Sequence, residues 1–104
     1  MNTLEKLEFK LRDKGIPSTI VVENDDNRII YVRSLFIVKD KIVGINAYDR
    51  DNYIVLNING TELTETLDID KDINIDNFLS ICNKLINNNL DKIMEEEVRW
   101  RVWR

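Results

Sequence analysis

The chain has 104 residues, of which 43% are hydrophobic and 33% charged, so it is suited to form one globular domain and is not a disordered tail. Its net charge of −4 and its pI near 4.8 argue against a general affinity for nucleic-acid phosphates or anionic lipid. It contains no histidine, which removes the commonest general base and the commonest metal ligand.

The compartment is predicted from the start of the chain and from its single cysteine. Met1 is followed by a charged amphipathic segment, unlike the apolar core of a signal peptide. No run approaches the roughly 18 apolar residues of a transmembrane helix. Cys82 has no second cysteine with which to form an internal disulfide, which favours a reducing environment. We therefore expect a cytoplasmic protein that does not associate with membranes.

The first predicted element is a helix over residues 3–14. Asn2 is placed to cap it, and Glu5 three positions later completes the spacing of a capping box. The inward stripe consists of Leu4, Leu7 and Leu11. Gly15 and Pro17 end the helix, because glycine tolerates the left-handed cap and proline does not continue a helix.

A series of antiparallel strands follows, predicted from short β-branched and aromatic runs separated by polar clusters. The expected strands are 18–23, 28–38, 41–48, 53–58 and 61–67. Asn59 and Gly60 predict a two-residue turn before the last strand. Several strands are apolar at both alternating sets of positions, as at Ile29, Ile30, Tyr31 and Val32. Such a sheet requires cover on both faces, from helices, from a bound partner or from a second copy of the chain.

From Asp76 onward the apolar period becomes helical. One face carries Phe78, Leu79, Cys82, Leu85 and Ile86, and continues to Leu90 and Ile93. Asparagines 87–89 interrupt the pattern, so the sequence is compatible with one long helix or two short ones. The predicted fold is a single α+β domain over 1–104: an N-terminal helix, an antiparallel meander of four to five strands, and one or two C-terminal helices packed on the sheet.

An acidic segment connects the last strand to the C-terminal helix. It places aspartates at positions one, three, five and nine of a calcium loop, namely Asp68, Asp70, Asp72 and Asp76. Position six is Ile73 where glycine is required, and position twelve is Leu79 where a bidentate glutamate is expected, so no metal or other cofactor is predicted. The segment is interpreted as a solvated connection, with mimicry of nucleic-acid charge as the alternative.

Residues 98–104 contain both tryptophans of the chain, Trp100 and Trp103, together with Arg99, Arg101 and Arg104. Tryptophan and arginine are the residue types that most often anchor protein interfaces. Three interpretations follow: the tail docks on the sheet and joins the core, it anchors a partner, or it stacks on single-stranded nucleic acid.

Catalysis is not expected, because the serines have no histidine to activate them and the paired aspartates lie in predicted turns. The predicted function is a non-enzymatic protein-binding module, most specifically a small acidic inhibitor of a host nucleic-acid-processing enzyme, of the anti-restriction or anti-CRISPR type that phages and mobile elements encode. The alternatives are a small chaperone, an immunity protein or a single-stranded nucleic-acid binder. The predicted partner-binding residues are Trp100, Trp103, Arg99, Arg101 and Arg104 of the tail, and Asp68, Asp70 and Asp72 of the acidic segment.

Overall fold

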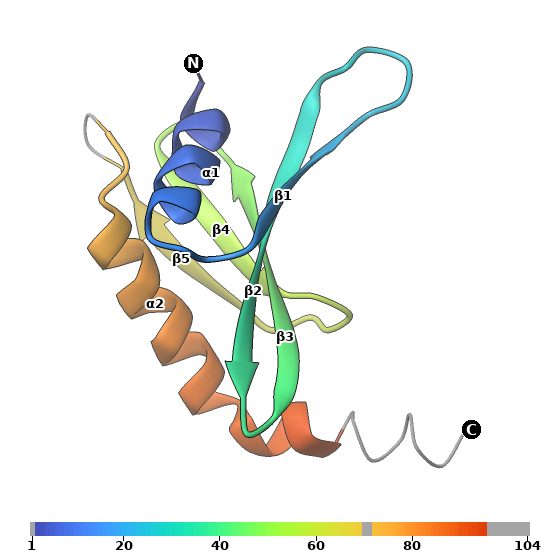
Figure 1. The fold of residues 1–104 in the computed structure, drawn as a ribbon, viewed down its shortest axis with the longest axis vertical. Coiled ribbons are helices and arrows are strands. Elements are labelled where there is room, and N and C mark those ends of the chain that lie inside the picture. The colour runs from blue at the N-terminus through green and yellow to red at the C-terminus, as the bar shows by residue number, and fades with distance from the viewer. Residues whose placement is uncertain (1, 70–71, 96–104) are drawn as a thin grey trace.

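The computed structural model describes residues 2–69 and 72–95 and has the predicted α+β architecture (Figure 1). In chain order its elements are α1 (Thr3–Asp13), β1 (Ser18–Val22), β2 (Ile29–Val38), β3 (Lys41–Asp49), β4 (Tyr53–Ile58), β5 (Thr64–Asp68) and α2 (Ile75–Asn88). Residues 90–95 form a second, short C-terminal helix.

The five strands form one antiparallel meander in the order β1-β2-β3-β4-β5. β2 and β3 meet in a tight hairpin in which Val38 pairs with Lys41. Lys39 and Asp40 between them have φ of 49° and 65°, as a type I′ turn requires. β2 extends beyond β1, whose pairing ends at Ser34, so the β2–β3 hairpin projects past the β1 edge of the sheet.

Both long helices pack on the same face of the sheet (Figure 1). Asn2 and Glu5 form the predicted capping box at the start of α1. Leucines 4, 7 and 11 of α1 and Phe78 and Cys82 of α2 join one buried cluster with the inward residues of β2 to β5. The apolar residues of this cluster come from alternate strand positions, among them the fully buried Val32, Ile45 and Leu56. The hydrophobic core therefore lies between the helices and this one sheet face.

The C-terminal helical region is divided at the predicted point. α2 ends at Asn88, and the side chain of Asn89 donates a hydrogen bond to the carbonyl of Leu85 at 2.8 Å. This bond competes with the helical backbone pattern and helps to explain why the region forms two helices. Ile93 of the second helix is buried in the core, so both helices pack on the sheet.

A β-turn is centred on Asn59 and Gly60 as predicted, since the Thr61 N–H donates to the carbonyl of Ile58 at 3.0 Å and Gly60 has φ of 83°. The predicted two-residue hairpin loop is wrong, because β5 begins only at Thr64. The side-chain amide of Asn57 donates to the carbonyls of Thr61 and Leu63, and the Thr61 hydroxyl donates to the carbonyl of Ile58. These side-chain bonds stabilise a five-residue connection over 59–63 that contains the turn.

Replacing Leu7 of α1 by alanine should lower the free energy of unfolding by about 2–5 kcal/mol, because the side chain is fully buried between α1 and the sheet. Phe9 lies on the same helix with 60% of its surface exposed, so Phe9→Ala should change stability by less than about 0.5 kcal/mol. Urea denaturation of both variants measures the difference. Equal effects would show that α1 does not pack as described.

Candidate functional site

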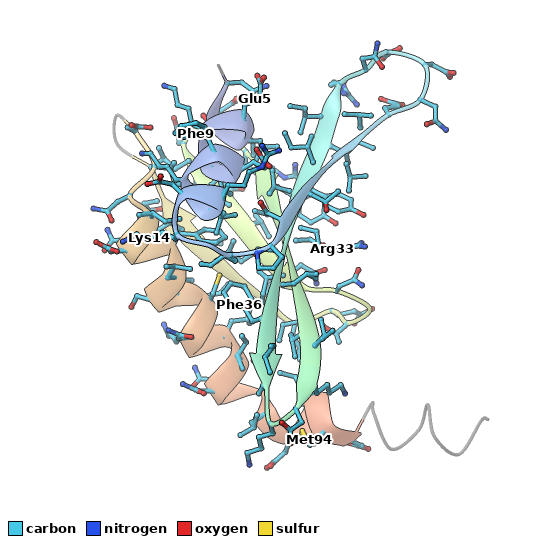
Figure 2. All side chains as sticks on the ribbon, viewed as in Figure 1. Glu5, Phe9, Lys14, Arg33, Phe36 and Met94 are labelled. Carbon is cyan, nitrogen blue, oxygen red and sulfur yellow. The ribbon has the colours of Figure 1, made fainter. Side chains whose placement is uncertain are left out.

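The sheet face opposite α1 and α2, here called the open face, is not covered by any helix or strand in residues 2–69 and 72–95. Its side chains alternate with the buried ones along each strand, as Arg33 does between Val32 and Ser34. In Figure 2 the labelled Arg33 extends to the side away from the helices. The open face is therefore available to a partner in the part of the chain that is described.

A row of polar residues crosses the middle of the open face. Strand register places one residue from each strand side by side: Thr19, Arg33, Asn46, Asn57 and Thr64. We call this row the polar belt. Its members come from five different strands, so the fold assembles the row and no single segment of sequence contains it.

Arg33 is the centre of the hydrogen bonds in and beside the polar belt. Its Nε donates to Oδ1 of Asn46 at 2.9 Å. Its Nη2 donates to the Tyr31 hydroxyl at 2.9 Å and to Oδ1 of Asn59 at 3.0 Å. The amide of Asn46, which is only 3% exposed, also donates to Oδ1 of Asn59 at 3.2 Å. The guanidinium is thus fixed in orientation by three neutral acceptors.

Gly44 lies beside both Arg33 and Asn59. A Cβ atom at Gly44 would lie 3.4 Å from Cβ of Asn59 and 3.5 Å from Cδ of Arg33, which is ordinary van der Waals contact. The backbone N–H of Asn59 also donates to the carbonyl of Gly44 at 2.8 Å. The stem of Arg33 therefore crosses β3 at Gly44 on its way to Asn59.

Two tyrosines lie beside the polar belt. The rings of Tyr31 and Tyr48 are 5.1 Å apart between centroids and tilted by 49°. The guanidinium of Arg33 lies 5.4 Å from the centre of the Tyr31 ring, and that of Arg50 lies 5.5 Å from the Tyr48 ring. Each ring therefore already has one aromatic neighbour and one arginine, an arrangement stabilised by quadrupole and cation–π attraction.

On the other side of the polar belt the open face becomes apolar. Ile37 and Ile42 are a cross-strand pair next to the hairpin turn, and they are 81% and 68% exposed. Leu35 continues this surface toward Arg33. We call these three residues the apolar tip. On the covered side of the hairpin, the Lys41 ammonium donates to the carbonyl of Ile93, which ties the hairpin to the second C-terminal helix.

No carboxylate within residues 2–69 and 72–95 pairs with Arg33. Among the carboxylates in strand register on the open face, the nearest is Asp68 on β5, three strands away and so at least about 14 Å across the sheet. The polar belt thus carries a positive charge whose hydrogen-bond partners are all uncharged.

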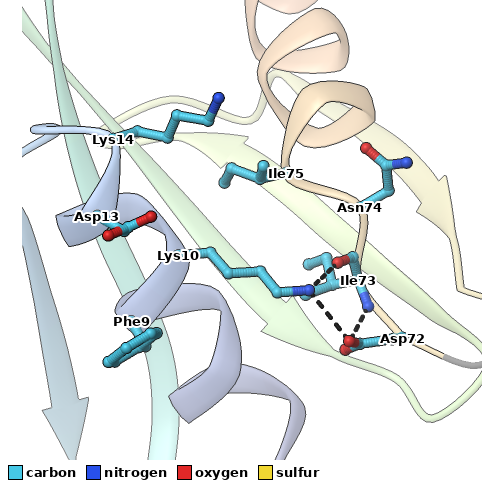
Figure 3. Close-up of a pocket in the computed structure, with 8 residues that line it drawn as sticks. All are labelled: Phe9, Lys10, Asp13, Lys14, Asp72, Ile73, Asn74 and Ile75. Atoms are coloured by element: carbon cyan, nitrogen blue, oxygen red, sulfur yellow. Dashed lines mark hydrogen bonds and ion pairs between the residues drawn. The ribbon is translucent and has the colours of Figure 1, made fainter.

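The predicted acidic site is only partly described. Asp68 is exposed at the end of β5, whereas Asp72 forms an ion pair with Lys10 of α1 at 3.1 Å (Figure 3). Lys10 also donates to the carbonyl of Ile73. The Lys10 ammonium and the backbone N–H of Ile73 hold the pKa of Asp72 below its ordinary value. Asp72 therefore fastens the segment before α2 to α1, and its predicted role toward a partner stays a prediction.

The remaining predicted partner-binding residues lie outside the described ranges: Asp70, Arg99, Trp100, Arg101, Trp103 and Arg104. Beside the Lys10–Asp72 pair, Phe9 and Lys14 line a shallow hollow of about 470 Å³ (Figure 3). Lys10 is paired with Asp72 at 3.1 Å, and Lys14 lies 3.7 Å from Asp76, so the ammonium groups of this hollow already face carboxylates.

Metal-ligating side chains do not gather in the described part of the chain, and its cysteine is buried. Residues 2–69 and 72–95 contain no cluster of three or more metal-ligating side chains. Cys82 is fully buried on α2, and burial raises the pKa of its thiol from an ordinary value of 9.0 to about 12. None of the helices described there is long and apolar enough to span a bilayer.

Comparison of the chain with protein-family models, with curated proteins and with solved structures gives no match. The sequence predicted the strands but did not indicate that Arg33, Asn46 and Asn59 meet, because 13 residues separate each from the next. Predicting this contact requires the pairing register of the central strands. The tight turn at Lys39 and Asp40 fixes that register.

Cys82 should react with iodoacetamide at pH 8 only after the chain is unfolded, because the folded thiol is buried and protonated. Its raised pKa also sets a pH dependence. The unfolded thiol ionises first, so this contribution to stability is complete below about pH 9 and is lost as the pH rises toward 12. Mass spectrometry after timed labelling measures the reactivity. Equal labelling of folded and urea-unfolded protein would contradict the buried position.

Proposed function

We propose that this chain is a non-enzymatic protein-binding module whose partner docks on the open face. The observation that carries the proposal is the apolar tip, where Ile37 and Ile42 expose most of their surface on a paired, ordered hairpin. Burying a side chain of this size on binding contributes about 1.5–3 kcal/mol. Exposed isoleucines beside one another on a sheet are a surface that a partner can use.

Two further features support a protein partner. Tyrosine and arginine are enriched at protein interfaces; Arg33 adjoins the apolar tip, and Tyr31 and Tyr48 lie on the same face across the polar belt from it. The hairpin is held from the covered side by the hydrogen bond from Lys41 to Ile93, so less conformational entropy is lost when it binds.

A single-stranded nucleic acid is the less favoured occupant of the open face. Base stacking requires free aromatic faces, whereas each of Tyr31 and Tyr48 already contacts another ring and an arginine. The net charge of −4 opposes attraction of phosphates. Within the protein-binding class, inhibition of a host nucleic-acid-processing enzyme remains the narrower proposal, and it rests on the small size and acidity of the chain.

The test compares capture of proteins from a lysate of the source cell by the full chain and by Ile42→Asp. This side chain is 68% exposed, so the substitution should leave the fold intact and change stability by no more than about 1 kcal/mol. Capture should fall at least tenfold, because the charge must be desolvated in the interface. Circular dichroism and a urea melt confirm that the variant is folded.

Two controls locate the binding surface. Phe9→Asp places the same charge on an exposed apolar residue of α1 and should capture the partner as the unchanged chain does. A chain truncated after Glu97 tests the predicted anchor at Trp100 and Trp103. Loss of capture with Phe9→Asp or with the truncation, together with full capture by Ile42→Asp, would move the interface away from the open face.

A further inference from the structure

We infer that Arg33 binds a carboxylate of the partner protein, so that the open face recognises an acidic side chain flanked by apolar ones. The inference rests on the proposed function, because it names the chemistry of the partner that occupies the same face. It is carried by the hydrogen bonding of the guanidinium, by the absence of a charged partner for it in the described residues, and by the adjoining apolar tip.

The hydrogen-bond inventory of Arg33 leaves one nitrogen available. The single N–H of Nε donates to Asn46, and the two N–H groups of Nη2 donate to Tyr31 and Asn59. Within residues 2–69 and 72–95, no acceptor is bonded to Nη1, which has two more N–H groups. The fold therefore holds a guanidinium in place and leaves two of its donors for a ligand.

The three acceptors on Arg33 are two amide oxygens and a hydroxyl, so they orient the guanidinium without neutralising it. A carboxylate on Nη1 would form a charge-assisted hydrogen bond, which is stronger than any bond that the group makes within the chain. Because the orientation is already fixed, little side-chain entropy is lost on binding. Charge complementarity thus favours an anionic group at this position.

The surroundings favour a protein carboxylate over a nucleic-acid phosphate. Leu35 is two residues from Arg33 along β2, and Ile37 is two residues further, so apolar surface begins about 7 Å along the strand from the backbone of Arg33. A phosphodiester chain has no apolar groups to bury there, whereas an extended peptide places side chains at the same spacing. The expected ligand is a segment with aspartate or glutamate next to aliphatic or aromatic residues.

The experiment is a selection of random twelve-residue peptides on phage against the full chain. Parallel selections use Arg33→Gln, Ile42→Asp and Lys84→Gln, the last of which removes the same charge from an exposed position on α2. Peptides selected by the unchanged chain and by Lys84→Gln should contain an acidic residue flanked by apolar ones. Ile42→Asp should select none of them.

Binding of a synthetic selected peptide is then measured by calorimetry. Arg33→Gln should weaken binding at least tenfold, and replacing the acidic residue of the peptide by its amide should weaken it equally on the unchanged chain. The amide peptide should bind Arg33→Gln with no further loss, which identifies the two groups as partners. Arg33→Lys should restore part of the affinity, because it keeps the charge but not the fork geometry.

The outcomes separate this inference from the proposed function. Selected peptides without acidic residues, or equal binding of a peptide to Arg33→Gln and to the unchanged chain, would overturn the inference that Arg33 binds a carboxylate. Either result would leave the open face as a binding surface. Peptides that bind Ile42→Asp as well as they bind the unchanged chain would overturn both. A chain mass that is doubled in light scattering and becomes single in Ile42→Asp, with no peptide selected, would assign the face to a second copy and overturn the inference.

Discussion

Packing of α1 and α2 against one face of the sheet is the interaction on which the rest of the structure depends. The three leucines of α1 and the apolar face of α2 bury the inward residues of the strands in one cluster. Because side chains alternate between the faces, the same strands must present a second set of residues that these helices do not reach. The fold has two layers, so the sheet has an open face because the helices cover only the other one. The side chains of the open face are therefore free to contact a partner.

The polar belt shows how an uncovered face is stabilised without being made uniformly charged. Asn46 is almost completely buried within a strand, where an unsatisfied amide would cost about 1–3 kcal/mol. Arg33 and Asn59 supply its partners. Stability thus requires the guanidinium to be fixed in place. The same bonds prepare it for a ligand, since none of its acceptors carries charge.

Most of the fold could be predicted from the sequence, because the signals for its helices, strands and turns are local. The capping box at Asn2 and Glu5, the tight turn at Lys39 and Asp40, and the break near Asn89 each lie within a few residues. The loop over 59–63 was missed because Asn57 and Thr61 stabilise it through side-chain bonds that turn propensities do not include. The site is non-local, since Arg33 and Asn59 are 26 residues apart and meet only through register. The tail residues chosen from composition lie outside the described ranges.

In the proposed interaction, affinity and specificity on the open face have different physical sources. The apolar tip contributes by removing exposed isoleucine surface from water, which is strong but selects no particular partner. Arg33 provides the specificity. A partner without a carboxylate would cover the guanidinium, and its Nη1 donors would lose hydrogen bonds to water without gaining others in exchange. The chain is acidic overall, so an acidic partner is repelled at long range. Screening within about 8 Å at physiological salt limits that repulsion, while the contact at Arg33 acts at hydrogen-bond distance. Recognition on this face is therefore decided after the partner has arrived and depends little on electrostatic steering.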